Sequence, residues 1–242
     1  PTTYQCGKNC PANPGAWDLH GVFHKKLRKQ RKAWRDGGAV QQQAREAAER
    51  DARRAAHTGD EWVRLVAEGA RHMSKQDYRR AAKSYREAIA LEPDEPAPYF
   101  NLGNALNQSG HHVEAAQRYL EAKERRPTGS ERWARATSMA FDKLMRKECG
   151  EVAKPEWWND EGLKALSARV VRAAPDDQAA IHMRAVVLSG LSDAWEARPR
   201  SATELKEAAV HYERAAALCP APVLRAELAR RAGWCREDAE AM

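Results

Sequence analysis

Small and apolar side chains recur every three or four residues in the segment 78–93, YRRAAKSYREAIALEP. They fall on one side of a helix, and Pro93 then ends the pattern. Nearly the same phrase returns as HVEAAQRYLEAKERRP at 112–127 and as ELKEAAVHYERAAALCP at 204–220. Alternating polar and apolar runs, which would indicate strands, are hard to find. We therefore expect an all-α protein.

The spacing between these phrases is regular. Tyr85 and Tyr119 lie 34 residues apart, and the same step separates Gly69 from Gly103. A period of about 34 residues with two helices per unit is the pattern of tetratricopeptide (TPR) repeats. From about residue 60 to residue 220 the chain resembles the TPR family. The resemblance implies an α-solenoid of about four antiparallel helix pairs.

The first two units predict the helix pairs 62–75 with 78–91 and 96–109 with 112–125. Small residues in each pair should let the two helices approach closely. On this basis we expect Gly69 to face the region of Ala81, and Gly103 to face Ala115.

The later units contain two insertions. A third first helix should begin near Ser130, and its partner should run over 157–174, after about 14 extra residues around 147–156. A fourth pair is predicted at 177–191 and 202–218, with about 11 extra residues around SDAWEARPR. Trp157 and Trp158 are either an exposed binding pair or, as is more common, anchors that lock the first insertion onto the array.

Helical segments also flank the array. Residues 221–240 predict a C-terminal capping helix with Leu224, Leu228 and Ala232 on one side. Upstream, residues 39–56 predict a charged helix with little apolar surface. This helix is either a solvated linker, as is typical of such a pattern, or an interface.

Cysteine and histidine pairs cluster near the beginning of the sequence. Cys6 and Cys10 form a C-x3-C pair, and His20 and His24 form an H-x3-H pair. Thiolates and imidazoles in two closely spaced pairs suit tetrahedral Zn²⁺, which would supply folding energy that this short segment lacks. The sequence therefore predicts zinc as a cofactor of this segment.

The order Tyr4, Cys6, Cys10, Trp17, His20, His24 resembles the second half of a MYND zinc finger, with His24 in the place of the final cysteine. That family uses two zinc ions and two further cysteine pairs upstream. The four residues are then part of a larger finger, a single Cys2His2 site, or a remnant that binds no metal. Together with the TPR-like repeats, this segment is similar to multicopy proteins of unicellular algae, which implies a role in protein interaction.

These boundaries divide the chain into four parts: a zinc-finger-like segment with a basic helix (1–36), a charged helix or linker (37–59), the TPR array (60–220) and the capping helix (221–242).

The net charge of +7 is partly local. The basic run consists of Lys25, Lys26, Arg28, Lys29, Arg31, Lys32 and Arg35. Such a run permits attraction to nucleic acid or to acidic surfaces. No apolar run approaches the roughly 20 residues that span a bilayer, and no signal-peptide pattern opens the sequence. Five cysteines without that pattern favour a reducing, intracellular compartment, where Cys149, Cys219 and Cys235 would be small helical packing residues.

By TPR family position, the first helix of each repeat lines the concave groove. The groove residues are Val66, Met73, Phe100, Asn101, Asn104, Asn107, Gln108, Arg135 and Phe141. Asparagine offers both a donor and an acceptor to an extended peptide backbone, although the same residues are equally typical of turns and wet surfaces. Phe100, Met73 and Phe141 would accept apolar side chains.

No catalytic motif is found in the sequence: there is no phosphate-binding glycine loop, G-x-S-x-G or H-E-x-x-H. The sequence predicts a non-catalytic scaffold that holds a peptide or protein segment in the TPR groove. The alternative is a basic subunit or adaptor of a nucleic-acid-containing or other large assembly.

Overall fold

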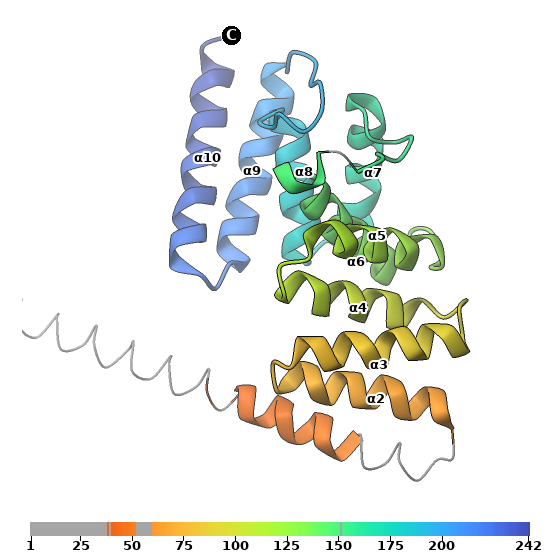
Figure 1. Ribbon diagram of the computed structural model, residues 1–242. Coiled ribbons are helices and arrows are strands. Elements are labelled where there is room, and N and C mark those ends of the chain that lie inside the picture. Colours follow the sequence, from red (N-terminus) through yellow and green to blue (C-terminus); the bar gives the residue numbers. More distant parts are fainter. Residues whose placement is uncertain (1–37, 39, 52–59, 151) are drawn as a thin grey trace, which may run out of the picture.

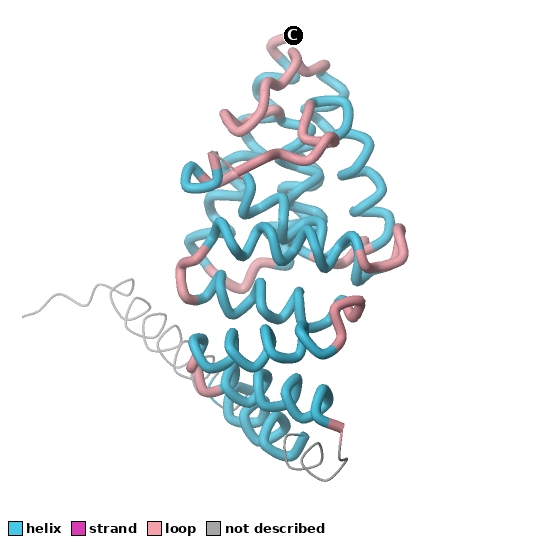
Figure 2. The backbone as a smooth tube through the Cα atoms, turned by 45° about the vertical axis from the view of Figure 1, so that its right-hand side comes forward, coloured by secondary structure: helices cyan, strands magenta, loops and turns pink. Residues whose placement is uncertain are grey.

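A computed structural model describes residues 38, 40–51, 60–150 and 152–242. The described part is all helical and contains no strand (Figure 2). After the helix at 40–51, the elements are α2 (Glu61–Ser74), α3 (Tyr78–Leu91), α4 (Pro96–Gln108), α5 (His112–Glu124), α6 (Glu131–Leu144), η1 (Lys147–Cys149), α7 (Asp160–Ala173), α8 (Gln178–Ser189), α9 (Ala202–Leu218) and α10 (Pro222–Glu240). The predicted α-solenoid is confirmed.

Successive helices stack on one another, and their direction turns along the array. In Figure 1, α2 to α5 lie across the lower part of the molecule, whereas α8, α9 and α10 stand upright at its upper left. Each helix packs mainly on its neighbours in sequence, as in a solenoid. The core is accordingly divided into clusters along the array, and the largest surrounds α8.

Local signals set the helix ends. The Asp60 carboxylate accepts hydrogen bonds from the backbone N–H groups of Trp62 and Val63, and Asp77 caps α3 in the same way. Helix α4 begins with Pro96 at its first turn, where the missing N–H has no helical partner to lose. These caps place the first two helix pairs at the predicted positions.

The close approach within each pair differs from the expectation. A Cβ added to Gly69 would lie 2.5 Å from a ring carbon of Tyr85, and one added to Gly103 would lie 2.8 Å from a ring carbon of Tyr119. The glycines therefore make room for large, buried tyrosine rings on the opposite helix. The nearest side chains are thus the tyrosines that lie one helical turn after Ala81 and Ala115, rather than the alanines themselves.

The first insertion connects α6 to α7. The ammonium group of Lys154 donates to the carbonyl oxygens of Leu144 and Cys149, at 3.0 and 2.8 Å, and so ties the loop to the end of α6. Helix α7 begins at Asp160, three residues later than predicted, because the Asn159 side chain caps it by accepting from the backbone N–H of Gly162. The tryptophan pair thus lies in the loop.

Trp158 joins the two insertions. Its indole N–H donates to the carbonyl oxygen of Ala194 in the second insertion, at 2.9 Å. Its ring lies 5.6 Å from the ring of Phe141 and 6.2 Å from that of Trp195, measured between centroids. The prediction that the tryptophans anchor an insertion is confirmed, and Trp158 holds the second insertion as well as the first.

A buried ion pair holds the second insertion. The Arg200 guanidinium donates to both carboxylate oxygens of Asp160, at 2.9 and 2.5 Å, and to the carbonyl oxygen of Val187 at 2.9 Å. Both charged side chains are only 5% exposed. Lys164 lies 3.3 Å from the same carboxylate, and the Trp195 indole N–H donates to it at 3.4 Å. This network ties the end of the insertion to the start of α7.

Helix α10 caps the array as expected, but one leucine on the side that faces the array is exposed. Leu228 and Ala232 are buried against the neighbouring helices, whereas Leu224 is 45% exposed. The three predicted packing cysteines are buried. Of these, Cys149 lies in η1 and Cys219 directly follows α9, so only Cys235 lies within an α-helix.

The upstream helix at 40–51 contacts the end of α2. The Arg45 guanidinium donates to the carbonyl oxygen of Ser74 at 3.1 Å, and Lys75 lies 3.0 Å from Glu49. These polar contacts lie on a mostly exposed helix, and they place it at the first end of the array.

Candidate functional site

The predicted groove centres on α4, where Phe100 is half-buried. Its ring lies 5.5 Å from the Tyr119 ring. The guanidinium carbons of Arg126 and Arg135 lie 4.9 and 5.8 Å from the Phe100 centroid. These distances suit cation–π contact, so α4, α6 and the α5–α6 turn meet at one aromatic ring.

A row of amides continues from Phe100 along α4. Asn101, Asn104 and Asn107 are spaced three residues apart, which keeps them near one side of the helix, and all three are half-buried. The Tyr119 hydroxyl donates to Oδ1 of Asn104 at 2.8 Å. Burial raises the pKa of Tyr119, so the hydroxyl keeps its proton and remains a donor. Asn104 is thereby oriented with its amide N–H groups available.

The amides on either side of Asn104 are unpaired. In the described part of the chain, the side chains of Asn101 and Asn107 make no hydrogen bond. Each can therefore donate to and accept from a ligand backbone without breaking a bond inside the protein. The row thus has the chemistry needed to pair with an extended peptide.

The remaining predicted groove residues are spread more widely. Val66 is half-buried on α2. Met73 and Gln108 line a pocket of about 360 Å³ together with residues of the helix at 40–51, including Arg45. This pocket lies at the end of α2, and the upstream helix forms one of its walls.

Phe141 does not line an open groove. It is 2% exposed, and its ring lies 5.6 Å from that of Trp158 and 6.0 Å from that of Trp195. The two insertions therefore cover the position that would be accessible in an uninterrupted repeat. The assignment of Phe141 to the groove was wrong because the sequence does not show where an insertion folds back.

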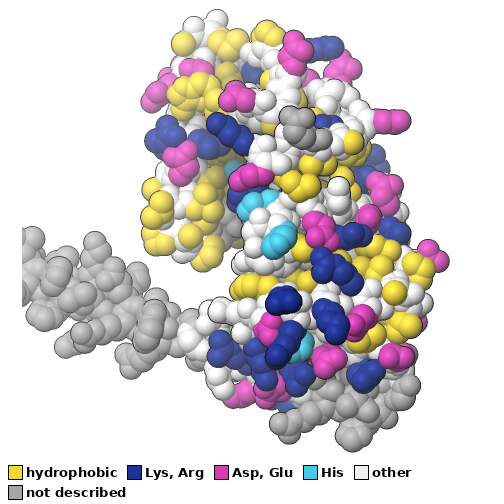
Figure 3. Space-filling model, in the orientation of Figure 1, with side chains coloured by type: hydrophobic (Ala, Val, Ile, Leu, Met, Phe, Trp, Pro, Cys, Tyr) yellow, Lys and Arg dark blue, Asp and Glu magenta, His cyan; other side chains and the backbone are white. Residues whose placement is uncertain are grey.

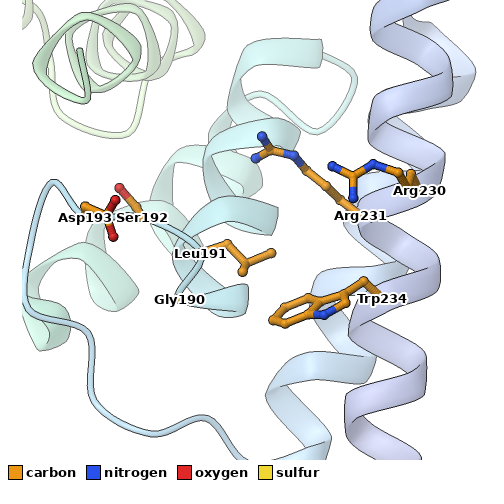
Figure 4. Close-up of a pocket in the computed structure, with 7 residues that line it drawn as sticks. All are labelled: Gly190, Leu191, Ser192, Asp193, Arg230, Arg231 and Trp234. Atoms are coloured by element: carbon orange, nitrogen blue, oxygen red, sulfur yellow. The ribbon is translucent and has the colours of Figure 1, made fainter. Parts of the chain in front are cut away.

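A second cleft lies between the second insertion and α10. Its volume is about 500 Å³, and its lining includes Leu191, Asp193, Arg230, Arg231 and Trp234. In Figure 4, Trp234 extends from α10 toward Leu191, and the Arg231 side chain lies beside them. Glu227 accepts hydrogen bonds from both arginines, at 2.8–2.9 Å. The cleft is thus lined by both apolar and charged side chains, and its two arginines are already paired with Glu227.

Charged side chains are distributed unevenly over the solenoid. Figure 3 shows Lys and Arg gathered over the lower part of the molecule, where α2 to α5 lie in Figure 1, with Asp and Glu between them. Arg126, which lies beside Phe100, and Arg132, whose charge acts on Arg126, are not among the predicted groove residues. The signal in the sequence was the adjacent arginines of ERRP and the two arginines, three residues apart, of SERWAR.

The predicted zinc ligands, Cys6, Cys10, His20 and His24, lie outside the described residues, as does the whole basic run from Lys25 to Arg35. Within the described ranges, no group of three or more His, Cys, Asp or Glu side chains is placed to hold a metal ion. In the same ranges, no helix has both the length and the apolar character that crossing a bilayer requires.

The fold and its repeated helix pairs define an α-solenoid. The family model described as TPR repeat matches residues 69–110, from the middle of α2 to the turn after α4. A search of curated proteins found no match. Among solved structures, 78% of the chain aligns with 46% of a chain in the crystal structure of the APC/C hetero-tetramer Cut9–Hcn1, at 10% identity and a TM-score of 0.33. The chain therefore spans less than half the length of that protein.

Proposed function

We propose that this protein is a non-catalytic scaffold that holds an extended segment of a partner protein against α4 and its neighbours. Solenoid repeats create long binding surfaces, and the TPR repeats provide this general basis. The observation that carries the proposal is the amide row on α4. Asn101 and Asn107 have unpaired side chains in the described structure, and Asn104 is oriented by Tyr119.

The arrangement suits a peptide backbone better than a compact ligand. Backbone N–H and C=O groups alternate along an extended chain, and amide side chains can pair with either. Phe100 offers a half-buried aromatic surface at one end of the row, where an apolar side chain of the ligand would pack. The amides therefore provide affinity for the backbone, and Phe100 provides a preference for one side chain.

The experiment is a selection of peptides from a displayed library on the full chain, followed by affinity measurement for the selected peptides. The test variant is Asn101→Ala with Asn107→Ala, which leaves the Tyr119–Asn104 hydrogen bond intact. We expect a loss of about tenfold or more, because two backbone hydrogen bonds would be removed.

The matched control is Val113→Ala with Gln117→Ala, which changes two exposed positions on α5, the second helix of the same unit. The control should bind as the wild type does, and circular dichroism should show unchanged helicity in both variants. Equal binding by the wild type and the asparagine variant would show that peptides bind elsewhere. The salt dependence should be shallow, whereas phosphate contacts to a nucleic acid would give a steep one.

A further inference from the structure

Three arginines gather near the α5–α6 turn: two lie against Phe100, and the charge of the third acts on one of them. We call Arg126, Arg132 and Arg135 the arginine cluster. Arg126 and Arg135 both lie against the Phe100 ring. The positive charges of Arg132 and Arg135 act on Arg126, and together with its burial, which is the larger effect, they lower the pKa of Arg126. The three charges are therefore close enough to repel one another.

The arginine cluster is not neutralised within the described structure. The two acids of α6 are Glu131 and Asp142: Asp142 pairs with Lys143 at 2.7 Å, and no ion pair joins Glu131 to the cluster. The side chains of Arg132 and Arg135 make no hydrogen bond to described residues. Several other described arginines pair with an acid, as Arg184 does with Glu207 at 2.9 Å. Within the described residues, the arginine cluster thus has no acidic partner for its side chains.

Several donors of the cluster remain available. One terminal nitrogen of Arg126 donates to the carbonyl oxygen of Arg132 at 2.6 Å, which fixes the side chain across the turn. The Nε–H of Arg126 is buried and has no partner. A buried donor without an acceptor is costly, and guanidiniums stacked on a ring keep their edges free for an anion. Two guanidiniums stacked on one ring and a third cation nearby therefore present several N–H donors in one place.

We infer that the arginine cluster binds a phosphate group on the partner segment, namely a phosphorylated serine or threonine in a peptide held along α4. This inference rests on the proposed function. A phosphate carries about −1.5 to −2 charges at pH 7 and three strong acceptor oxygens, so it matches three guanidiniums better than a single carboxylate does. Recognition of phosphorylated segments by groups of arginines is a general mode of peptide binding.

A nucleic acid would offer phosphates too, but the neighbouring surface favours a peptide. Single-stranded nucleic acids bind along positively charged grooves in which successive bases stack on aromatic side chains. Beside the arginine cluster there is one half-buried ring, Phe100, followed by the neutral amides Asn101, Asn104 and Asn107. A row of amides pairs with a peptide backbone and does not attract further phosphates.

The experiment uses the full chain and three pools of nine-residue peptides with a central phosphoserine, serine or glutamate. The variants are Arg132→Gln and Arg135→Gln, because Arg126 also holds the turn. The matched control is Arg172→Gln, which removes one charge from an exposed position on α7. We expect the phosphoserine pool to bind at least about tenfold more tightly than the other pools, and each cluster variant to lose most of that preference.

The outcomes separate this inference from the proposed function. Equal binding of the three pools by the wild type, or an undiminished preference in both cluster variants, overturns the inference. If the serine pool still binds and Asn101→Ala with Asn107→Ala weakens it, the proposed function stands without phosphate recognition. Binding of no pool overturns both. Displacement of the phosphoserine pool by submicromolar single-stranded RNA, lost in the cluster variants, would assign the arginines to RNA instead.

Discussion

Asp160→Asn should destabilise the second half of the solenoid strongly while barely changing its shape. The substitution keeps the size of the side chain and retains an oxygen that accepts from the Trp195 indole. It removes the negative charge that faces Arg200, whose side chain is 5% exposed. The arginine would then be a buried cation without a counter-charge, and neither solvent nor another acid would replace the lost carboxylate at that position.

The size of the effect follows from two estimates. Removing one member of a buried ion pair typically costs about 3–5 kcal/mol. Independently, hydrogen bonds from Arg200, the largest cause, lower the pKa of Asp160 from its usual 3.8 to about 2. A shift of nearly two units corresponds to about 2 kcal/mol of stabilisation of the charged form. We therefore expect a loss of about 2–5 kcal/mol in the free energy of unfolding.

The pH dependence has a defined sign. Because the folded-state pKa lies below the usual value, the stabilising contribution of Asp160 is complete above pH 3.8 and is lost as the pH falls toward about 2. The wild type should lose this contribution over that interval. Asp160→Asn has no carboxylate at this position, so the difference between the two proteins should shrink in acid.

The assay is urea unfolding followed by circular dichroism, combined with hydrogen exchange, because repeat arrays need not unfold in a single step. Faster exchange should be concentrated in α7, α8 and the second insertion. The control is Glu161→Gln, which removes a neighbouring acid whose pair with Arg198 is 69–72% exposed, and it should change stability by less than about 1 kcal/mol. If Asp160→Asn is no more destabilising than this control, the reasoning about a buried pair is refuted.

Three further outcomes test other parts of the structure. Gly103→Leu should destabilise the protein by about 1–3 kcal/mol in urea unfolding because its Cβ meets the Tyr119 ring at 2.8 Å; an unchanged midpoint would contradict this packing. Trp158→Phe should cost about 1 kcal/mol and speed exchange in the second insertion, since the bond to Ala194 is lost; unchanged exchange would argue against this anchor. Elemental analysis should find about one zinc per chain, absent from Cys6→Ser/Cys10→Ser; a wild type without zinc disproves the site.

The sequence alone determined the repeated part of the fold. The 34-residue step, the spacing of apolar residues and the stop at Pro93 predicted the type and position of the first two helix pairs. These features act between residues within a few turns of one another. Helix periodicity and capping depend on such neighbours, so they can be recognised without knowledge of the tertiary structure.

The candidate site was only partly predictable. The positions of Phe100 and the three asparagines within the TPR pattern identified them as groove residues, because that pattern specifies which residues of a first helix face the groove. It could not show that Tyr119 orients Asn104, nor that Arg126 reaches the same ring from the α5–α6 turn. Both contacts depend on how closely the helices approach and on which way a turn directs its side chains.

The insertions depended most on tertiary structure. Asp160 and Arg200 are 40 residues apart, and Trp158 bonds to Ala194 across a similar separation. Their sequences carry no periodicity, and a loop of that length can close in many ways at similar entropic cost. Only the packed structure favours one conformation of these loops. In that conformation Asp160 is the buried counter-charge of Arg200, and two tryptophans cover Phe141.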